Sequence, residues 1–231
     1  MKYLTRIFVL AVVPLVKSKT VQELNNAVNE LREAILDNST RVLTTEQMEI
    51  YSRYGCWCYF EEDHGYGKSQ PVDDYDALCK TLHDGYECMI LDDLIDVDSG
   101  EACVPWETQY NSTLLLTPDL DQLRTNCDAN NVIGSCNNAA CKVESWFITN
   151  FVNKQLNGIT NDPTLLHANG FDVSTGCPIH AGTPGNKAGC GEYPTRFPFK
   201  HYEGLRACCQ GKTYSTEAYQ CCTDGSVKET C

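Results

Sequence analysis

Apolar residues recur along residues 20–37 at alternating spacings of three and four positions, which places them on one face of a helix. They are Val21, Leu24, Val28, Leu31 and Ile35. The pattern predicts an amphipathic helix within residues 19–45. Because two heptads are too few to establish a coiled coil, two interpretations stay open. The apolar seam packs on its own domain, or it joins two copies of the chain.

Two longer helices are predicted at about residues 73–95 and 138–156. Residues 157–187 are rich in glycine, asparagine, threonine and proline, which is typical of loops, and 161–187 is predicted to be a linker. Six cysteines fall within the last 44 residues, so 188–231 must be held by disulfides rather than by an apolar core. The predicted fold class is mainly α, with a disulfide-linked pair of antiparallel helices and a small Cys-rich C-terminal module.

The first 18 residues have the pattern of a secretory signal peptide. Lys2 and Arg6 supply positive charge, an apolar run extends from Ile7 to Val16, and Ser18 is a small residue near the expected cleavage point. The apolar run is shorter than the roughly 20 residues that span a bilayer. The sequence therefore predicts a secreted, extracellular protein with no transmembrane segment.

Fifteen of the 231 residues are cysteine. In an oxidising compartment they predict a disulfide framework rather than a reduced metal cluster. Because the number is odd, at least one thiol is free or bonds another chain, which would give a homo-oligomer. Asn38-Ser39-Thr40 and Asn111-Ser112-Thr113 are acceptor sequences for glycosylation in a secreted protein.

The net charge of −13 comes from 18 Lys and Arg against 31 Asp and Glu. This balance argues against nucleic acid as a partner, because phosphate binding needs clustered basic residues. It also argues against strong attraction to anionic membranes. It is compatible with binding hard cations through carboxylates.

The most informative motif begins at Tyr54 and reads YGCWCYFEEDHGYGKSQPVDDYDALCKTLHDGYEC. It resembles the secretory phospholipase A2 family, whose pattern is Y-G-C-x-C-G-x-G-G-x-G-x-P-x-D-x-x-D-x-C-C-x-x-H-D-x-C-Y. The resemblance covers about residues 46–160, and YGCxC followed by PxDxxD is improbable by chance. The residues that match in order are Tyr54, Gly55, Cys56, Cys58, Pro71, Asp73, Asp76 and Cys79.

The resemblance implies a phospholipase A2-type fold and calcium-dependent hydrolysis of the sn-2 ester of phospholipids at a lipid interface. His83 would be the general base that activates water, and Glu144 on the second helix would orient it. Asp84 and the backbone carbonyls of Trp57 and Tyr59 would hold Ca²⁺, which stabilises the oxyanion.

The loop after Cys58 departs from the family pattern. The family has glycines there, whereas this chain reads YFEE and is five residues longer before Pro71. Glycines permit backbone shapes that other residues resist. Two interpretations of the loop stay open, a set of carboxylate ligands for calcium and a solvated acidic turn. The residues concerned are Glu61, Glu62 and Asp63.

The histidine also comes one residue late. Counting without a gap from Asp76 puts Leu82 in the place of the family's histidine, His83 in the place of its calcium aspartate and Tyr86 on its tyrosine. One residue rotates a helix position by about 100°, so a regular helix would aim His83 away from the site. A π-bulge would restore His83 as base and Asp84 as calcium ligand. Both registers stay open.

The cysteines are consistent with the ungapped register. Leu78 and Gly85 stand where the family has two cysteines, and Val143 and Asn150 stand where their two partners belong. In this register two disulfides of the family pattern are therefore absent, and each lacks both of its cysteines. For the retained cysteines the resemblance implies Cys58 with Cys79, Cys127 with Cys141, and Cys136 with Cys88 or Cys103.

Two further patterns bear on function. An acidic run is more typical of a solvated loop than of an EF-hand, because Gly100 replaces an oxygen ligand; it comprises Asp92, Asp93, Asp96, Asp98 and Glu101. The tail contains CCxGxxYxxxxxxCCxDG, which is similar to the di-cysteine repeats of galaxin-like extracellular matrix proteins and implies binding or assembly.

Two functions are therefore predicted as alternatives. The first is a calcium-dependent, phospholipase A2-like ester hydrolase. The second is a catalytically inactive binding or matrix protein on the same scaffold, in which Leu82 fills the place of the base.

Overall fold

The computed structural model describes residues 53–59, 69–111, 119–156, 161–178 and 185–231. The predicted signal peptide, the N-terminal amphipathic helix, Asn38 and the acidic residues 61–63 lie outside the described residues.

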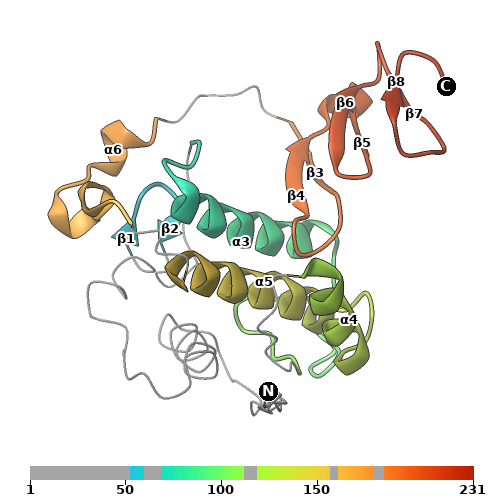
Figure 1. Ribbon diagram of the computed structural model, residues 1–231. Coiled ribbons are helices and arrows are strands. Elements are labelled where there is room, and N and C mark those ends of the chain that lie inside the picture. The colour runs from blue at the N-terminus through green and yellow to red at the C-terminus, as the bar shows by residue number, and fades with distance from the viewer. Residues whose placement is uncertain (1–52, 60–68, 112–118, 157–160, 179–184) are drawn as a thin grey trace, which may run out of the picture.

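Two long antiparallel helices form the centre of the fold (Figure 1). α3 spans Asp74–Leu91 and α5 spans Cys136–Leu156. Both predicted helices are confirmed. α3 begins after Asp73, whose carboxylate accepts the Asp76 N–H at 2.8 Å and caps the helix. It ends earlier than predicted because the chain turns out of the helix after Asp92, and Asp93 adopts a φ of 50°.

The two helices pack through an apolar seam. The rings of Tyr75 and Phe151 meet edge-on at 5.4 Å, and Lys154 bonds Asp74 at 3.0 Å, joining the start of α3 to the end of α5. Further along, Gly85 brings the helices close: a Cβ there would lie 2.8 Å from a methyl carbon of Val143. Buried residues at this interface include Leu78, Leu82, Met89, Val143, Phe147, Ile148 and Val152.

No disulfide joins α3 to α5, which corrects the predicted disulfide-linked helix pair. All fifteen cysteines lie in the described residues, and those on each helix either bond a neighbouring segment or, in the case of Cys88, stay free. The bridges of the helical body are Cys56–Cys177, Cys58–Cys79, Cys103–Cys136 and Cys127–Cys141. The implied pairs are confirmed, with Cys103 as the partner of Cys136. Side-chain packing therefore holds the helix pair.

α4, Leu120–Asn130, packs beside α5 and is tied to it by the Cys127–Cys141 bridge. Its first turn is capped by Asp119, whose carboxylate accepts the N–H groups of Asp121 and Gln122.

Residues 161–178 fold back onto the helical body. They contain η1 (Pro163–Leu165), η2 (His167–Asn169) and α6 (Val173–Gly176). The Cys56–Cys177 disulfide ties them to the turn between β1 (Arg53–Tyr54) and β2 (Cys58–Tyr59), and Leu166 forms a β-bridge with Tyr54. Residues 161–178 of the predicted linker 161–187 are thus fastened to the body.

The C-terminal module is a row of three antiparallel β-hairpins. Their elements are β3 (Lys187–Cys190) with β4 (Phe197–Lys200), β5 (Arg206–Cys209) with β6 (Lys212–Ser215), and β7 (Gln220–Cys221) with β8 (Val227–Lys228), with η3 (Tyr202–Gly204) between the first two hairpins.

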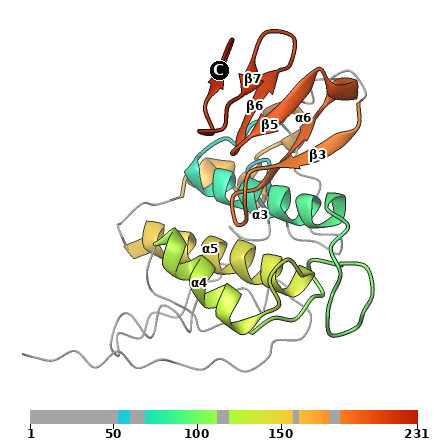
Figure 2. The same cartoon turned by 90° about the vertical axis from the view of Figure 1, so that its right-hand side faces the viewer.

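The di-cysteine pair Cys208-Cys209 connects the second hairpin to the other two. Cys208 bonds Cys190 in the first hairpin, and Cys209 bonds Cys221 in the third. Cys222 bonds Cys231 and closes the C-terminus. The first hairpin lies against α3, and the other two project away from the helices (Figure 2).

The fold is therefore only partly described by the term mainly α. In the described ranges the helices accompany four two-stranded antiparallel sheets, and seven disulfides make the chain cysteine-rich. Within the part of the chain that the structure describes, none of the helices combines the length and the apolar character needed to cross a membrane.

Candidate functional site

Glu144 is a fully buried carboxylate on α5. Its Oε1 accepts the Tyr86 hydroxyl at 2.8 Å, and its Oε2 accepts the Tyr110 hydroxyl at 2.9 Å. Burial raises the pKa of both phenols well above the usual value, and the neighbouring carboxylate raises it further. Both tyrosines therefore remain protonated and donate to Glu144, which compensates part of the cost of burying it.

The bond from Tyr86 to Glu144 defines which face of α3 meets α5. Leu82 lies four positions before Tyr86, on the same face, and is fully buried in the core. His83 is turned from Leu82 by about 100°. α3 is α-helical from end to end, so it lacks the π-bulge that would rotate His83 onto the Leu82 face.

His83, predicted as the general base, is buried beside the β1–β2 turn. Its Nε2 lies 2.8 Å from the carbonyl oxygen of Trp57, and the two rings are 6.0 Å apart. Because a carbonyl only accepts hydrogen bonds, this nitrogen carries the proton and donates it. The lone pair of the neutral ring then lies on Nδ1, which is the nitrogen that would take a proton from water if His83 acted as the base.

Asp84, predicted as a calcium ligand, forms an ion pair with Lys80 one turn earlier on α3. The Lys80 ammonium also lies 4.9 Å from the centre of the Trp57 ring, within the range of a cation–π contact. Burial raises the pKa of the Asp84 carboxyl, and Lys80 opposes that shift. The charge of Asp84 is thus balanced by a side chain of the same helix.

The structure brings the predicted calcium ligands to one region, and the oxygens of two of them, Trp57 and Asp84, are bonded within the protein. The Trp57 carbonyl accepts from His83, Asp84 bonds Lys80, and Tyr59 belongs to β2, where it pairs with Arg53. Calcium takes six to eight oxygen ligands. No group of three or more metal-binding side chains occurs in the described ranges, and calcium binding by these residues stays a prediction.

Asp76 holds the β1–β2 turn, a role that motif spacing alone does not reveal. Its fully buried carboxylate accepts four backbone N–H groups at 2.6–3.2 Å. Burial raises the pKa of Asp76, and these donors oppose the shift. Gly55 has a φ of +58°, and a Cβ there would lie 2.6 Å from the Asp76 carboxyl carbon. The four donors belong to Cys56, Trp57, Cys58 and Val72.

A second histidine, outside the sequence motif, also bonds this turn. His167 Nε2 lies 2.9 Å from the Gly55 carbonyl oxygen, and its ring stacks on Phe171 at 5.8 Å. Two imidazoles and one carboxylate from distant segments therefore satisfy the polar groups of the turn.

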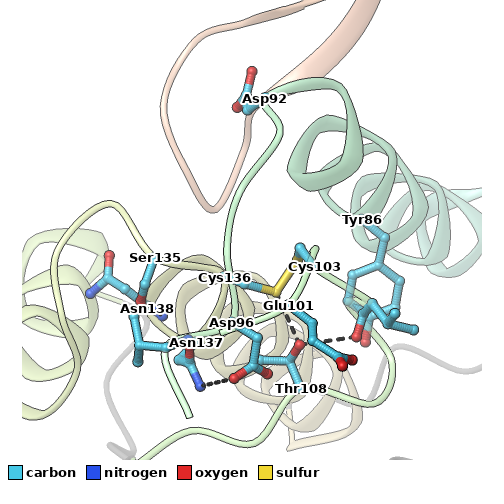
Figure 3. Close-up of a disulfide and its surroundings, with 12 residues drawn as sticks. Tyr86, Asp92, Asp96, Glu101, Cys103, Thr108, Ser135, Cys136, Asn137 and Asn138 are labelled. Carbon is cyan, nitrogen blue, oxygen red and sulfur yellow. Dashed lines mark hydrogen bonds between the residues drawn. A yellow bond between two sulfur atoms is a disulfide. The ribbon is translucent and has the colours of Figure 1, made fainter. Parts of the chain in front are cut away.

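The acidic run forms an exposed loop, as predicted, with Asp93, Asp98 and Glu101 in solvent. Asp96 caps its own turn by accepting the N–H groups of Asp98 and Ser99. Asp96, Glu101 and Thr108 lie beside the Cys103–Cys136 disulfide (Figure 3). Together with Glu107 and Gln109 they line a pocket of about 640 Å³.

Comparison of the chain with protein-family models, curated proteins and solved structures found no match to any of them. Both family resemblances in the sequence stay predictions. The functional proposal below depends on the contacts described above.

Proposed function

We propose that this chain is a secreted extracellular binding protein on a phospholipase A2-like scaffold and that it does not hydrolyse phospholipids. The observation that carries the proposal is the hydrogen bond from Tyr86 to Glu144. In the ungapped register Tyr86 takes the family's tyrosine position, and Leu82 takes the place of the base. A leucine side chain has no group that can accept a proton from water.

The contact between Gly85 and Val143 supports the same register. Both residues stand where the resemblance implies half-cystines, and a Cβ at Gly85 would lie 3.5 Å from the Val143 Cβ. Cβ atoms of bridged cysteines are about 3.5–4.5 Å apart. The Cβ separation at these two positions is thus the one expected where the family has a disulfide and this chain has lost both cysteines.

His83 supports the loss of calcium as well as the loss of the base. In the ungapped register it takes the place of the calcium aspartate, and its N–H bonds the Trp57 carbonyl that the resemblance assigns to the ion. A side-chain donor thus occupies a ligand that a metal would need. The projecting Cys-rich hairpins (Figure 2) favour binding or assembly as the remaining role.

We expect the oxidised, purified protein to release no sn-2 fatty acid from zwitterionic phospholipid vesicles, with excess Ca²⁺ or with chelator. Release should equal the protein-free blank, because the scaffold lacks a base at the position of Leu82. The measurement is fatty-acid release over hours, with sedimentation of the same vesicles to record binding separately.

The His83→Ala variant separates the two predicted functions. Our proposal expects it to match the unmodified chain at the blank level, while an active secreted phospholipase A2 on the same vesicles confirms that the substrate is competent. Calcium-dependent release that His83→Ala abolishes would overturn the proposal and establish the enzyme.

We also expect the folded protein to be insensitive to calcium. A ligand at 100 times its Kd stabilises the folded state by about 2.7 kcal/mol, which would raise Tm by several degrees. Because the Trp57 and Asp84 oxygens are already bonded, Tm in millimolar Ca²⁺ and in chelator should agree within about 1 °C, an interval small beside that shift. Thermal unfolding with the disulfides intact measures this.

The exposed acidic loop needs its own control. A Tm rise in Ca²⁺ that disappears in Asp98→Asn would locate weak binding in that loop and leave the proposal intact. A rise that persists in Asp98→Asn and disappears in Asp84→Asn would place calcium at the predicted site and contradict the proposal.

A further inference from the structure

The contact between the C-terminal module and the helical body is entirely non-covalent. The three disulfides of the module are internal to it, and the four disulfides of the body are internal to the body. The β3–β4 hairpin nevertheless lies along α3, as Figures 1 and 2 both show. Contacts made by side chains hold the hairpin against α3.

The strongest of these contacts is a clamp on Asp92 at the end of α3. Arg196 binds the carboxylate with two nitrogens, Nε to Oδ2 at 2.7 Å and Nη2 to Oδ1 at 2.8 Å, and the Tyr193 hydroxyl donates to Oδ2 at 2.9 Å. Two-nitrogen binding of a carboxylate by arginine is strong and fixes orientation. Gly189 makes room for it, because a Cβ there would lie 2.5 Å from the Arg196 Nε.

Two weaker contacts extend the interface. Lys187 at the start of β3 pairs with Glu87 on α3, and the Arg124 Nε of α4 donates to the Tyr193 carbonyl at 2.9 Å. The hairpin therefore spans α3 and α4.

Cys88, the free cysteine, lies on α3 between Glu87 and Asp92, the two residues of this segment that the hairpin binds. It is completely buried, and its carbonyl accepts the Asp92 N–H at 2.8 Å, so the thiol sits one turn before the clamp on the same face of α3. Arg196 and Asp92 are both close enough to act on it electrostatically. Burial raises the pKa of the Cys88 thiol to about 12, so the reactive thiolate is scarce while the hairpin is docked.

We propose that the β3–β4 hairpin is a latch: docked on Asp92 it keeps Cys88 out of thiol–disulfide exchange, and undocked it leaves Cys88 able to join two copies of the chain. The covalent steps need an oxidised low-mass disulfide such as oxidised glutathione. The Cys88 thiolate attacks one sulfur of that disulfide, forming a mixed disulfide and releasing one thiolate. Cys88 of a second copy then displaces the remaining glutathione thiolate, so that two protein thiols are oxidised and one glutathione disulfide is reduced to two thiols.

The first test measures Cys88 labelling by an aromatic disulfide reagent at neutral pH. We expect slow labelling of the unmodified chain and labelling at least about tenfold faster in Arg196→Ala, because losing the charge-assisted bonds shifts the hairpin toward the undocked state. Arg206→Ala is the matched control: this arginine bonds Thr213 within the second hairpin and should leave the rate unchanged.

If Arg196→Ala fails to fold, Tyr193→Phe is the second variant, and it weakens docking of the β3–β4 hairpin by a smaller amount. It removes one hydroxyl donor from Asp92 and should raise the labelling rate about threefold or more. The latch is overturned if folded Arg196→Ala or Tyr193→Phe labels at the unmodified rate, or if the unmodified chain labels as fast as it does in denaturant.

The second test adds oxidised glutathione and separates the products without reducing agent. The Arg196→Ala variant should accumulate a disulfide-linked dimer that the unmodified chain lacks, and Arg196→Ala with Cys88→Ser should remain monomeric. A dimer that persists without Cys88, or no dimer from a variant whose thiol labels rapidly, would overturn the assembly step.

Discussion

The Asp76→Ala variant is expected to lose about 4 kcal/mol or more of unfolding free energy, because four backbone N–H groups lose their acceptor at once and each buried orphan donor costs about 1–3 kcal/mol. These donors bond the fully buried carboxylate at 2.6–3.2 Å. Since small domains are stable by only about 5–15 kcal/mol, secretion yield should fall as well. Urea unfolding with the disulfides intact measures the loss.

Two variants show whether the loss comes from the acceptor. Asp76→Asn keeps the shape but turns one oxygen into a donor facing other donors, so it should cost nearly as much as alanine. Asp74→Asn removes an exposed charge from the same helix turn, where the pair with Lys154 should contribute less than about 1 kcal/mol. If Asp76→Asn were as stable as Asp74→Asn, the carboxylate would not be what holds the β1–β2 turn.

The paired substitution Gly85→Cys and Val143→Cys is expected to form a new disulfide between α3 and α5 and to stabilise the protein by about 3 kcal/mol. A Cβ at Gly85 would lie 3.5 Å from the Val143 Cβ, at the short end of the disulfide range. The existing Cys103–Cys136 bridge already shortens the loop that would be closed, which limits the gain. Peptide mapping identifies the bridge, and thermal or urea unfolding measures its effect.

A single substitution provides the control for that bridge. Gly85→Ser adds volume against Val143 without a thiol and should destabilise by about 1–3 kcal/mol, as overpacked cores do. Reducing the new disulfide should therefore turn the gain in unfolding free energy of the double-cysteine variant into a loss. A pair that stays reduced in an oxidising buffer would mean that these positions do not face each other, which would undermine the ungapped register and the proposed lack of activity.

The two long helices followed from local features of the sequence, whereas α4 was not predicted. Asp73 followed by acidic first-turn residues marks the start of α3, and the resemblance to the phospholipase A2 pattern implied the Cys58–Cys79 and Cys127–Cys141 pairs that the structure contains. The spacing was not enough to decide which side of α3 faces Glu144. One residue of helix rotation separates the two registers, and a linear sequence shows no rotation.

The side chains that bond the backbone polar groups of the β1–β2 turn could not be predicted from the sequence, for a related reason. His167 bonds Gly55 from more than a hundred residues away, and the segment that carries it reads as a loop in the sequence. Its position depends on the Cys56–Cys177 bridge and the β-bridge at Leu166, which are contacts between distant parts of the chain.

By itself the sequence determined the odd thiol, the acidic charge, the helix pair and the Cys-rich tail, because composition and periodicity are local properties. Only the tertiary structure decided that Leu82 and Tyr86 face α5, that His83 bonds Trp57 and that the first hairpin docks on Glu87 and Asp92, either side of the buried Cys88. Those facts depend on helix rotation and on contacts between residues far apart in the chain. Both are fixed by packing the core and by pairing buried polar groups, which happens only when the whole chain folds.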